Sequence, residues 1–272
     1  YTDYGLAIQK RFFGHFLKGE KTGWDKQPKV TLNVRHPGEK FVPRAENEWP
    51  LSRTKWTRLF LEPTRKFLSQ EVSGTKREVS FKALGDGVTF LTEPSEQDME
   101  LTGPMAAKLH ISSSTTDADF FLIVRIFDPN MKEITFKGAL DPHTPIAQGW
   151  LRASHRKLDK KKTLPYRPYH THDQKQLLKP GEVYELDIEI VPSCIVVPAG
   201  YRIGLTVRGR DYVFTGDVGG RLSNMKNVFT GVGPFLHDDP RDRPISVFGG
   251  TTTIHFGPGR ENYVLLPVIP GK

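Results

Sequence analysis

The sequence predicts a mainly β protein, a jelly-roll β-sandwich preceded by one amphipathic helix. Short runs of alternating apolar and polar residues recur through residues 99–272, and a period of two is typical of half-buried strands. Turns rich in glycine and proline separate these runs, and a single long stretch has helical periodicity. Many short strands with almost no helix favour a sandwich or jelly-roll. The sequence has no repeat of fixed period, so a propeller or solenoid is not expected.

The predicted helix covers residues 4–18. Thr2 or Asp3 can cap its start, and Gly19 can end it. Five apolar residues share one face at the helical period of 3.6 residues, namely Ile8, Phe12, Phe13, Phe16 and Leu17. Three phenylalanines carry too much apolar area to leave in water. We therefore expect this face either to pack on a domain or to be unusually exposed as a contact surface.

The segment before residue 99 is expected to be more irregular. Alternation over residues 30–34 predicts a short strand, and His36-Pro37-Gly38 predicts a turn after it. Residues 41–52 are interrupted by proline and are expected to form a linker. A second strand is predicted over residues 56–61, followed by a weakly patterned region over residues 62–87.

The strongest strand signals lie in residues 179–211, where two runs alternate strictly. The apolar residues of 184–190 and of 202–208 are expected to be buried. Their neighbours are expected to face solvent, namely Glu185, Asp187 and Glu189 in the first run and Arg202, Gly204, Thr206 and Arg208 in the second. The other predicted strands are residues 106–113, 120–127, 150–153, 245–248, 252–256 and 263–269.

Composition is that of an ordinary soluble globular chain. The 272 residues are 37% hydrophobic and 26% charged, and the single cysteine, Cys194, cannot form an internal disulfide. No stretch approaches the ~20 apolar residues of a membrane helix, and residues 1–20 lack a signal-peptide pattern. The net charge is +8, and the densest basic run, residues 156–162, lies in no nucleic-acid motif. A solvated loop is therefore favoured there over a nucleic-acid or membrane patch, and the cytoplasm is favoured as the compartment.

Six blocks of the chain, in order, resemble the CocE/NonD hydrolase family, to which X-Pro dipeptidyl peptidases belong. They are RFFGHFLKGEKTGW at 11–24, ENEWPLSRTKWTRLFL at 46–61, TGPMAAKLHISSSTTDADFFLIVRIFDP at 102–129, GWLRASHRKLD at 149–159, residues 179–211 and YVLLPVIP at 263–270. The family has an α/β-hydrolase domain, a helical cap and a C-terminal jelly-roll. The resemblance implies that residues 1–23 hold the last helix of an otherwise absent hydrolase domain. It implies a connecting segment with a short strand at 24–52 and a galactose-binding-like jelly-roll at 53–272.

The motifs of a serine hydrolase are missing from the sequence. Such an enzyme needs a serine on a strand–turn–helix elbow, usually G-x-S-x-G, and neither Ser73-Gly74 nor Ser223-Asn224 has the partner glycine. An HGGG oxyanion motif is also absent, since Gly219-Gly220 precedes Arg221 and Gly249-Gly250 precedes threonines. We expect no catalytic, cofactor-binding or metal-binding residues, and we expect the chain to be inactive by itself.

Several clusters were weighed as sites, and a structural role is favoured for each. His170-Thr171-His172-Asp173 could offer two imidazoles to a metal if it formed a strand. His237-Asp238-Asp239 with Asp242 could hold calcium, although Arg241 and Arg243 offer ion pairs instead. Asp117 and Asp119 are expected to pair with Arg125 or Arg152. The remaining features are His15 on the helix, turn glycines at 85–87, 231–233 and 257–259, and the four tryptophans Trp24, Trp49, Trp56 and Trp150.

The favoured function is therefore that of the C-terminal jelly-roll of a serine hydrolase acting on acyl esters or amides. It would support the hydrolase domain of the same protein and wall part of its substrate cleft. A homo-oligomer is a further expectation, and neither nucleic acid nor a membrane is expected as a partner. The alternative is a free-standing β-sandwich that binds carbohydrate, because jelly-rolls host many functions.

Overall fold

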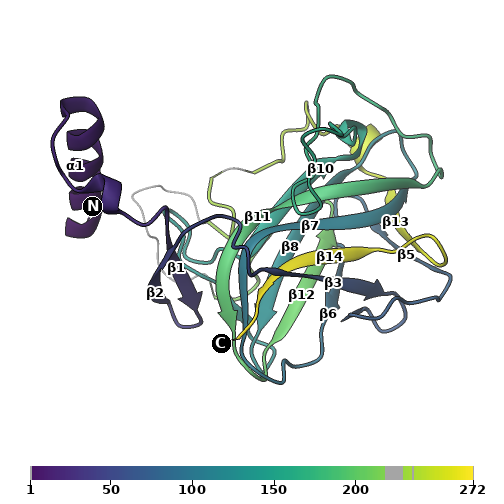
Figure 1. The fold of residues 1–272 in the computed structure, drawn as a ribbon. Helices are drawn as coiled ribbons and strands as arrows, with labels where there is room; N and C mark the ends of the chain where they lie inside the picture. Colours follow the sequence, from purple (N-terminus) through teal and green to yellow (C-terminus); the bar gives the residue numbers. More distant parts are fainter. Residues whose placement is uncertain (1, 218–228, 235, 272) are drawn as a thin grey trace.

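Strands dominate the computed structural model, which describes residues 2–217, 229–234 and 236–271 (Figure 1). The elements follow one another as α1 (Asp3–Lys18), η1 (Trp24–Lys26), β1 (Val30–His36), β2 (Lys40–Glu46), β3 (Lys55–Glu62), β4 (Phe67–Ser69), β5 (Arg77–Lys82), β6 (Val88–Leu91), β7 (Met99–Ser113), β8 (Asp119–Phe127), β9 (Glu133–Ile134), β10 (Ala147–Arg152), η2 (Ala153–His155), β11 (Tyr184–Val197), β12 (Arg202–Arg208), α2 (Ile245–Phe248), β13 (Thr251–Phe256) and β14 (Tyr263–Ile269). The mainly β prediction is confirmed. None of the described helices is long and apolar enough to span a membrane.

A single curled sheet contains all of these strands. Its hydrogen-bonded order is β10-β8-β12-β6-β4-β3-β14-β7-β11-β1-β2, with β13 joining β5 to β7 and β9 added to β8. Almost all pairs are antiparallel, as short connections require. The sheet curls until β10 lies against β11, and a side chain at Gly149 would overlap the backbone carbonyl of Glu189. Only glycine allows this close approach, so Gly149 fixes the seam between β10 and β11.

Alternating apolar residues fill the inside of the curl. Leu186, Ile188 and Ile190 of β11 are buried, and Glu185, Asp187 and Glu189 lie on the opposite face. This strand therefore has the two faces that its alternation predicts. Similar alternation in the neighbouring strands places Leu109, Leu122, Ile126 and Leu205 in the same core.

In β12, by contrast, the prediction of a solvent-exposed face is wrong. Thr206 and Arg208 are buried, as is Gly204. The Thr206 hydroxyl lies 2.8 Å from that of Thr89 and accepts a hydrogen bond from Arg125, and Arg208 pairs with Asp86. The strand lies between β8 and β6 with its outer face covered, and a period of two cannot reveal such a cover.

Two further segments differ from the expectations. The expected linker over residues 41–52 is wrong for its first half, which forms β2 and pairs with β1 in an antiparallel hairpin. Gly38, with φ of 85°, allows the tight turn between these strands, which is the turn expected there. The expected strand over residues 245–248 is instead the short helix α2, because Pro244 starts a helical turn by accepting the N–H groups of Val247 and Phe248.

The helix α1 has the predicted bounds and caps. Thr2 accepts the N–H of Gly5 at its start, and Gly19 adopts the left-handed conformation at its end. In Figure 1 the helix, in purple, stands away from the curled sheet. Its aromatic face packs on η1, where the rings of Phe12 and Trp24 lie 5.1 Å apart. Of the two expected outcomes for this face, exposure is the one observed.

Candidate functional site

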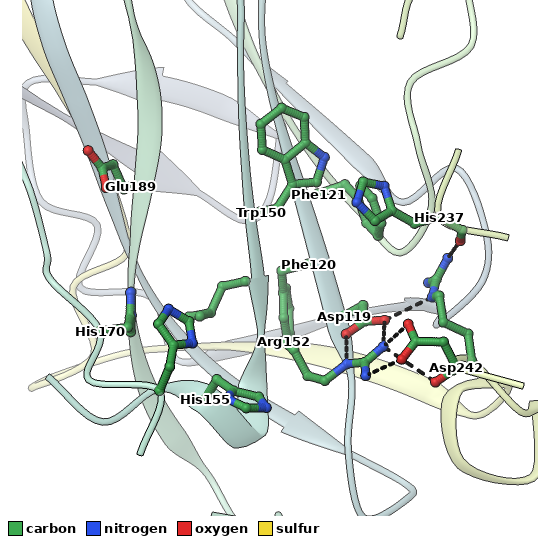
Figure 2. Close-up of a pocket in the computed structure, with 13 residues that line it drawn as sticks. Asp119, Phe120, Phe121, Trp150, Arg152, His155, His170, Glu189, His237 and Asp242 are labelled. Carbon is green, nitrogen blue, oxygen red and sulfur yellow. Dashed lines mark hydrogen bonds and ion pairs between the residues drawn. The ribbon is translucent and has the colours of Figure 1, made fainter. Parts of the chain in front are cut away.

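A pocket of about 450 Å³ opens where β10 meets β11, and we call it the seam pocket. Figure 2 shows Trp150 on its wall, with Glu189 and His170 to one side and His237 to the other. The pocket is lined by Asp119, Phe120, Phe121, Trp150, Leu151, Arg152, His155, His170, His172, Glu189, His237, Asp242 and Arg243. Its size is within the range of small-molecule sites.

An ion-pair network forms one wall of the seam pocket. Arg152 Nε donates to Asp119 Oδ1 at 2.8 Å, and Arg152 Nη2 donates to Asp242 Oδ2 at 2.9 Å. Arg243 Nε donates to the second Asp119 oxygen at 2.8 Å, and its other nitrogens donate to the carbonyls of His237 and Gly209. The hydrogen bonds that Arg152 donates to the Asp119 carboxylate raise the pKa of Arg152 further. Every nitrogen of both guanidinium groups thus has at least one acceptor.

The expected pairing of Asp119 with Arg152 is confirmed, whereas the pairing with Arg125 is wrong. Arg125 pairs with Glu133 at 2.6 Å, which lies on the neighbouring β9. The Asp117 carboxylate is buried and accepts the backbone N–H groups of Ala118 and Ser154. Asp117 therefore stabilises the turn before β8.

His237 is oriented by a buried carboxylate. Asp211 Oδ1 lies 2.9 Å from His237 Nδ1, and Asp211 Oδ2 accepts the His237 backbone N–H at 2.6 Å. A carboxylate only accepts hydrogen bonds, so Nδ1 carries a proton, and in the neutral ring Nε2 has a lone pair. The ring packs near Phe121 and Trp150. The carboxylates that could bind calcium are instead paired with arginines, Asp239 with Arg241 and Asp242 with Arg152.

Three histidines form the other wall. The His155 and His172 rings lie 5.5 Å apart, and those of His170 and His172 lie 6.0 Å apart. Burial, helped by neighbouring His172, lowers the pKa of His170. His170 is hydrogen-bonded to the backbone of Asp187, but its Nε2 is buried without a partner in the described part of the chain. Over the described residues, no group of three or more histidine, cysteine, aspartate or glutamate side chains is placed to hold a metal ion.

Glu189 completes this wall from the outer face of β11. Burial raises the pKa of its carboxyl, and Arg167 opposes that shift. The three carboxylates on this face of β11, Glu185, Asp187 and Glu189, therefore have different partners. Lys108 pairs with the first two, at 2.9 Å for Asp187, whereas Glu189 faces the seam pocket.

The four tryptophans do not line one groove. Trp24 packs on α1, and Trp49 is partly exposed before a cis proline. Trp56 stacks on Tyr166 with ring centroids 4.5 Å apart in a second, open pocket on β3 and β14. Trp150 is the one tryptophan of the four that lines the seam pocket.

Residues in the remaining clusters have structural surroundings. His15 lies edge-on to the Phe16 ring on α1. In the basic run, Lys157 pairs with Asp173 at 2.8 Å, and Arg156 lies over the Tyr184 ring. Among the expected turn glycines, Gly87, Gly231, Gly233, Gly257 and Gly259 all have positive φ. Ser73-Gly74 lies in an exposed loop before β5, and Ser223-Asn224 and Gly219-Gly220 lie outside the described residues.

One arrangement that the sequence did not suggest is a serine, a histidine and a glutamate on the outer face of the sheet. Ser112 Oγ of β7 lies 2.8 Å from His255 Nε2 of β13. His255 Nδ1 lies 3.0 Å from Glu78 Oε1 of β5, within ion-pair distance, yet Nδ1 lacks hydrogen-bond geometry. His255 and Glu78 are therefore close to each other but are not joined by a hydrogen bond. No motif marks these residues, because three separate strands bring them together.

The surroundings of Ser112 do not resemble a hydrolase site. Ser112 lies within the β7–β13 ladder opposite Thr253, in extended backbone. A catalytic serine instead needs an elbow that exposes it, with free N–H groups beside it to hold the oxyanion. Ser112 and His255 are only 7% and 6% exposed. The pair is placed to hold β13 against β7.

The curled sheet makes this chain a mainly β domain, and its sequence contains no G-x-S-x-G nucleophile elbow. The chain belongs to the family of the X-Pro dipeptidyl-peptidase C-terminal non-catalytic domain, whose model matches residues 22–265. A crystal structure of a CocE/NonD family hydrolase from Staphylococcus aureus superposes with a TM-score of 0.81 at 25% identity, covering 99% of this chain and 46% of that one. The resemblance drawn from the six sequence blocks is confirmed.

Curated relatives agree with this assignment. Cocaine esterase of Rhodococcus sp. (strain MB1 Bresler) is 24% identical over 302 residues, covering 97% of this chain and 46% of the relative. A Mycobacterium bovis protein whose name assigns it to the serine esterases is 28% identical over 129 residues, covering 46% of this chain and 19% of the relative. The chain thus spans less than half of the length of these relatives.

Proposed function

We propose that this chain is the C-terminal supporting part of a serine hydrolase that acts on acyl esters or amides, X-Pro dipeptidyl peptides among them. In this proposal the catalytic serine, histidine and acid belong to an α/β-hydrolase domain of the same protein. The match to a non-catalytic domain and the similarity to esterases support the proposal. The buried, elbow-free setting of Ser112 also supports it, because this serine cannot substitute for a missing nucleophile.

The exposed aromatic face of α1 is the observation that carries the proposal. Phe13, Phe16 and Leu17 are 50%, 59% and 76% exposed. A phenylalanine buries about 150–250 Å² when it packs, so these side chains together form a patch of several hundred Å². Patches of that size mark contact surfaces in soluble proteins. The hydrolase domain is the partner that the family assignment suggests for this face.

We further propose the division of the chain into three parts. Residues 1–23 would be the last helix of the hydrolase domain, residues 24–52 a connecting segment, and residues 53–272 the supporting domain. The supporting domain would be a jelly-roll of the galactose-binding-like type, which the antiparallel curled sheet favours. Docked through α1, it would wall part of the substrate cleft, and it could also join two copies of the protein.

Association with the hydrolase portion of the same protein tests this proposal. The chain, mixed with that portion, should form a complex in analytical ultracentrifugation, and the amides of α1 should gain protection from hydrogen exchange. Phe16→Asp should abolish both effects, because it places a charge in the centre of the aromatic face. Gln9→Asp introduces the same charge at another exposed position of α1 and should leave both intact. Equal binding by the two variants, or no complex at all, would contradict the proposal.

A further inference from the structure

We propose that the seam pocket binds an organic cation, a protonated primary amine carried on an apolar body. The proposal uses only residues of the curled sheet and its loops, so it stands or falls independently of the docking of α1. Nothing in the family assignment gives this pocket a ligand.

The charges that line the pocket favour a cation. Three carboxylates, Asp119, Glu189 and Asp242, face two guanidinium groups, Arg152 and Arg243. This leaves an excess of one negative charge, in a chain whose net charge is +8. The Asp211 carboxylate behind His237 adds to it. A local field of this sign attracts cations and repels anions.

The two guanidinium groups are not available to an anion. The nitrogens of Arg152 all donate to Asp119 or Asp242, at 2.8 to 3.1 Å for the bonds to Asp119. The nitrogens of Arg243 donate to Asp119 and to two backbone carbonyls. An anionic ligand would compete with these acceptors and approach the carboxylates of Asp119 and Asp242, which is unfavourable.

Groups with lone pairs remain available. The neutral ring of His237 offers its Nε2 lone pair, since Asp211 holds the proton on Nδ1. His170 Nε2 and His155 Nδ1 are buried without partners in the described part of the chain. Glu189 has no ion-pair partner among the described side chains, and the nearby Arg167 acts on it only at a distance. An ammonium group has three donors and no acceptor, so it matches a pocket of acceptors.

Trp150 supplies the apolar and aromatic part of the site. Its side chain is 41% exposed, and Figure 2 shows it between Glu189 and His237. An ammonium group over an indole face gains a cation–π interaction. Phe120, Phe121 and Leu151 extend the apolar wall. Together these groups suit a ligand with a charged end and an apolar body.

The test is a titration of the chain near neutral pH, followed by the NMR signal of the Trp150 indole N–H and by calorimetry. Phenethylammonium is the cationic probe, and 2-phenylethanol is the neutral probe of nearly the same shape. Phenethylammonium should give a saturable shift of the Trp150 signal, and 2-phenylethanol should bind at least about tenfold more weakly, because a charge-assisted hydrogen bond is lost. Methyl β-galactoside serves as the carbohydrate probe and should not bind.

Two variants on the same strand locate the charge recognition. Glu189→Gln should weaken phenethylammonium binding about tenfold or more. Glu185→Gln lies on the same face of β11 but outside the pocket, and it should leave binding within about twofold. Both replaced side chains lie on the face of β11 opposite the core, so folding should persist. Equal binding of the two probes, binding of the galactoside alone, or an unchanged affinity in Glu189→Gln would overturn the proposal.

Discussion

Removing the Asp119 carboxylate should destabilise the curled sheet strongly. Asp119 lies at the start of β8 and accepts hydrogen bonds from Arg152 and Arg243 at once. The side chains of Asp119 and Arg243 are 9% and 7% exposed, so solvent screens this pair weakly. In Asp119→Ala, Arg243 would keep its two carbonyl acceptors and Arg152 would keep Asp242. The buried charge of Arg243 would lose its counter-ion.

The expected loss follows from the burial of the pair. Breaking a buried ion pair by removing one partner costs about 3–5 kcal/mol. The acceptors that remain for both arginines place Asp119→Ala near the lower end, at about 3 kcal/mol. Asp119→Asn keeps one acceptor oxygen and should lose about 1–2 kcal/mol. The matched control is Asp239→Ala, because the partner Arg241 is 90% exposed and solvent screens this pair, so the change should cost much less than Asp119→Asn.

Urea unfolding followed by tryptophan fluorescence measures these differences. The free energies of unfolding of the three variants and the parent chain are compared at one ionic strength. We expect the order Asp119→Ala, Asp119→Asn, Asp239→Ala, from the least to the most stable. A loss for Asp119→Ala no larger than that of Asp239→Ala would refute it.

Three further outcomes are expected. Gly209→Ala should lower the urea midpoint sharply, because the new methyl group would overlap a backbone carbonyl oxygen, whereas Gly271→Ala has open space and should not. The pKa of Glu100 is lowered below its ordinary 4.5: burial raises it, but hydrogen bonds from Arg44 and Thr102 lower it more. The contribution of Glu100 to stability is therefore complete above that pH and is lost as the pH falls through the lowered pKa. Arg44→Gln should reduce the loss of stability on acidification, measured by urea unfolding. Burial raises the pKa of Cys194, so maleimide should label it at least about tenfold more slowly in the folded chain than in urea.

Local patterns in the sequence predicted those elements whose burial depends on their own residues and not on cover from distant strands. The alternation of β11 predicted both of its faces, and the caps and apolar stripe of α1 predicted its bounds to within one residue and its apolar face, whereas packing and exposure of that face were both left open. In β12 the same alternation misled, since Arg125 and Thr89 cover its outer face from other strands. Residues 245–248 form a short apolar run that fits either a strand or a helix, and Pro244 decides for the helix.

The seam pocket could not be predicted, because its walls come from segments far apart in the sequence. Trp150 and Glu189 line the same pocket because the sheet curls and the backbone of β11 approaches Gly149 closely. His170 and His237 were recognised as polar clusters, but their role as opposite walls of one pocket depends on that closure. The pairing of Asp119 with Arg152 was one of the two expected, and it forms because these residues lie opposite each other on the neighbouring strands β8 and β10.

The proposed supporting role requires that the chain perform no acyl transfer by itself. This is tested by labelling the chain with a fluorophosphonate and by measuring its hydrolysis of p-nitrophenyl esters. We expect no turnover and no labelled serine, with Ser112 unmodified because it is buried in the β7–β13 ladder. Stoichiometric labelling of Ser112 or of any other serine, with turnover that a serine-to-alanine variant abolishes, would contradict the supporting role.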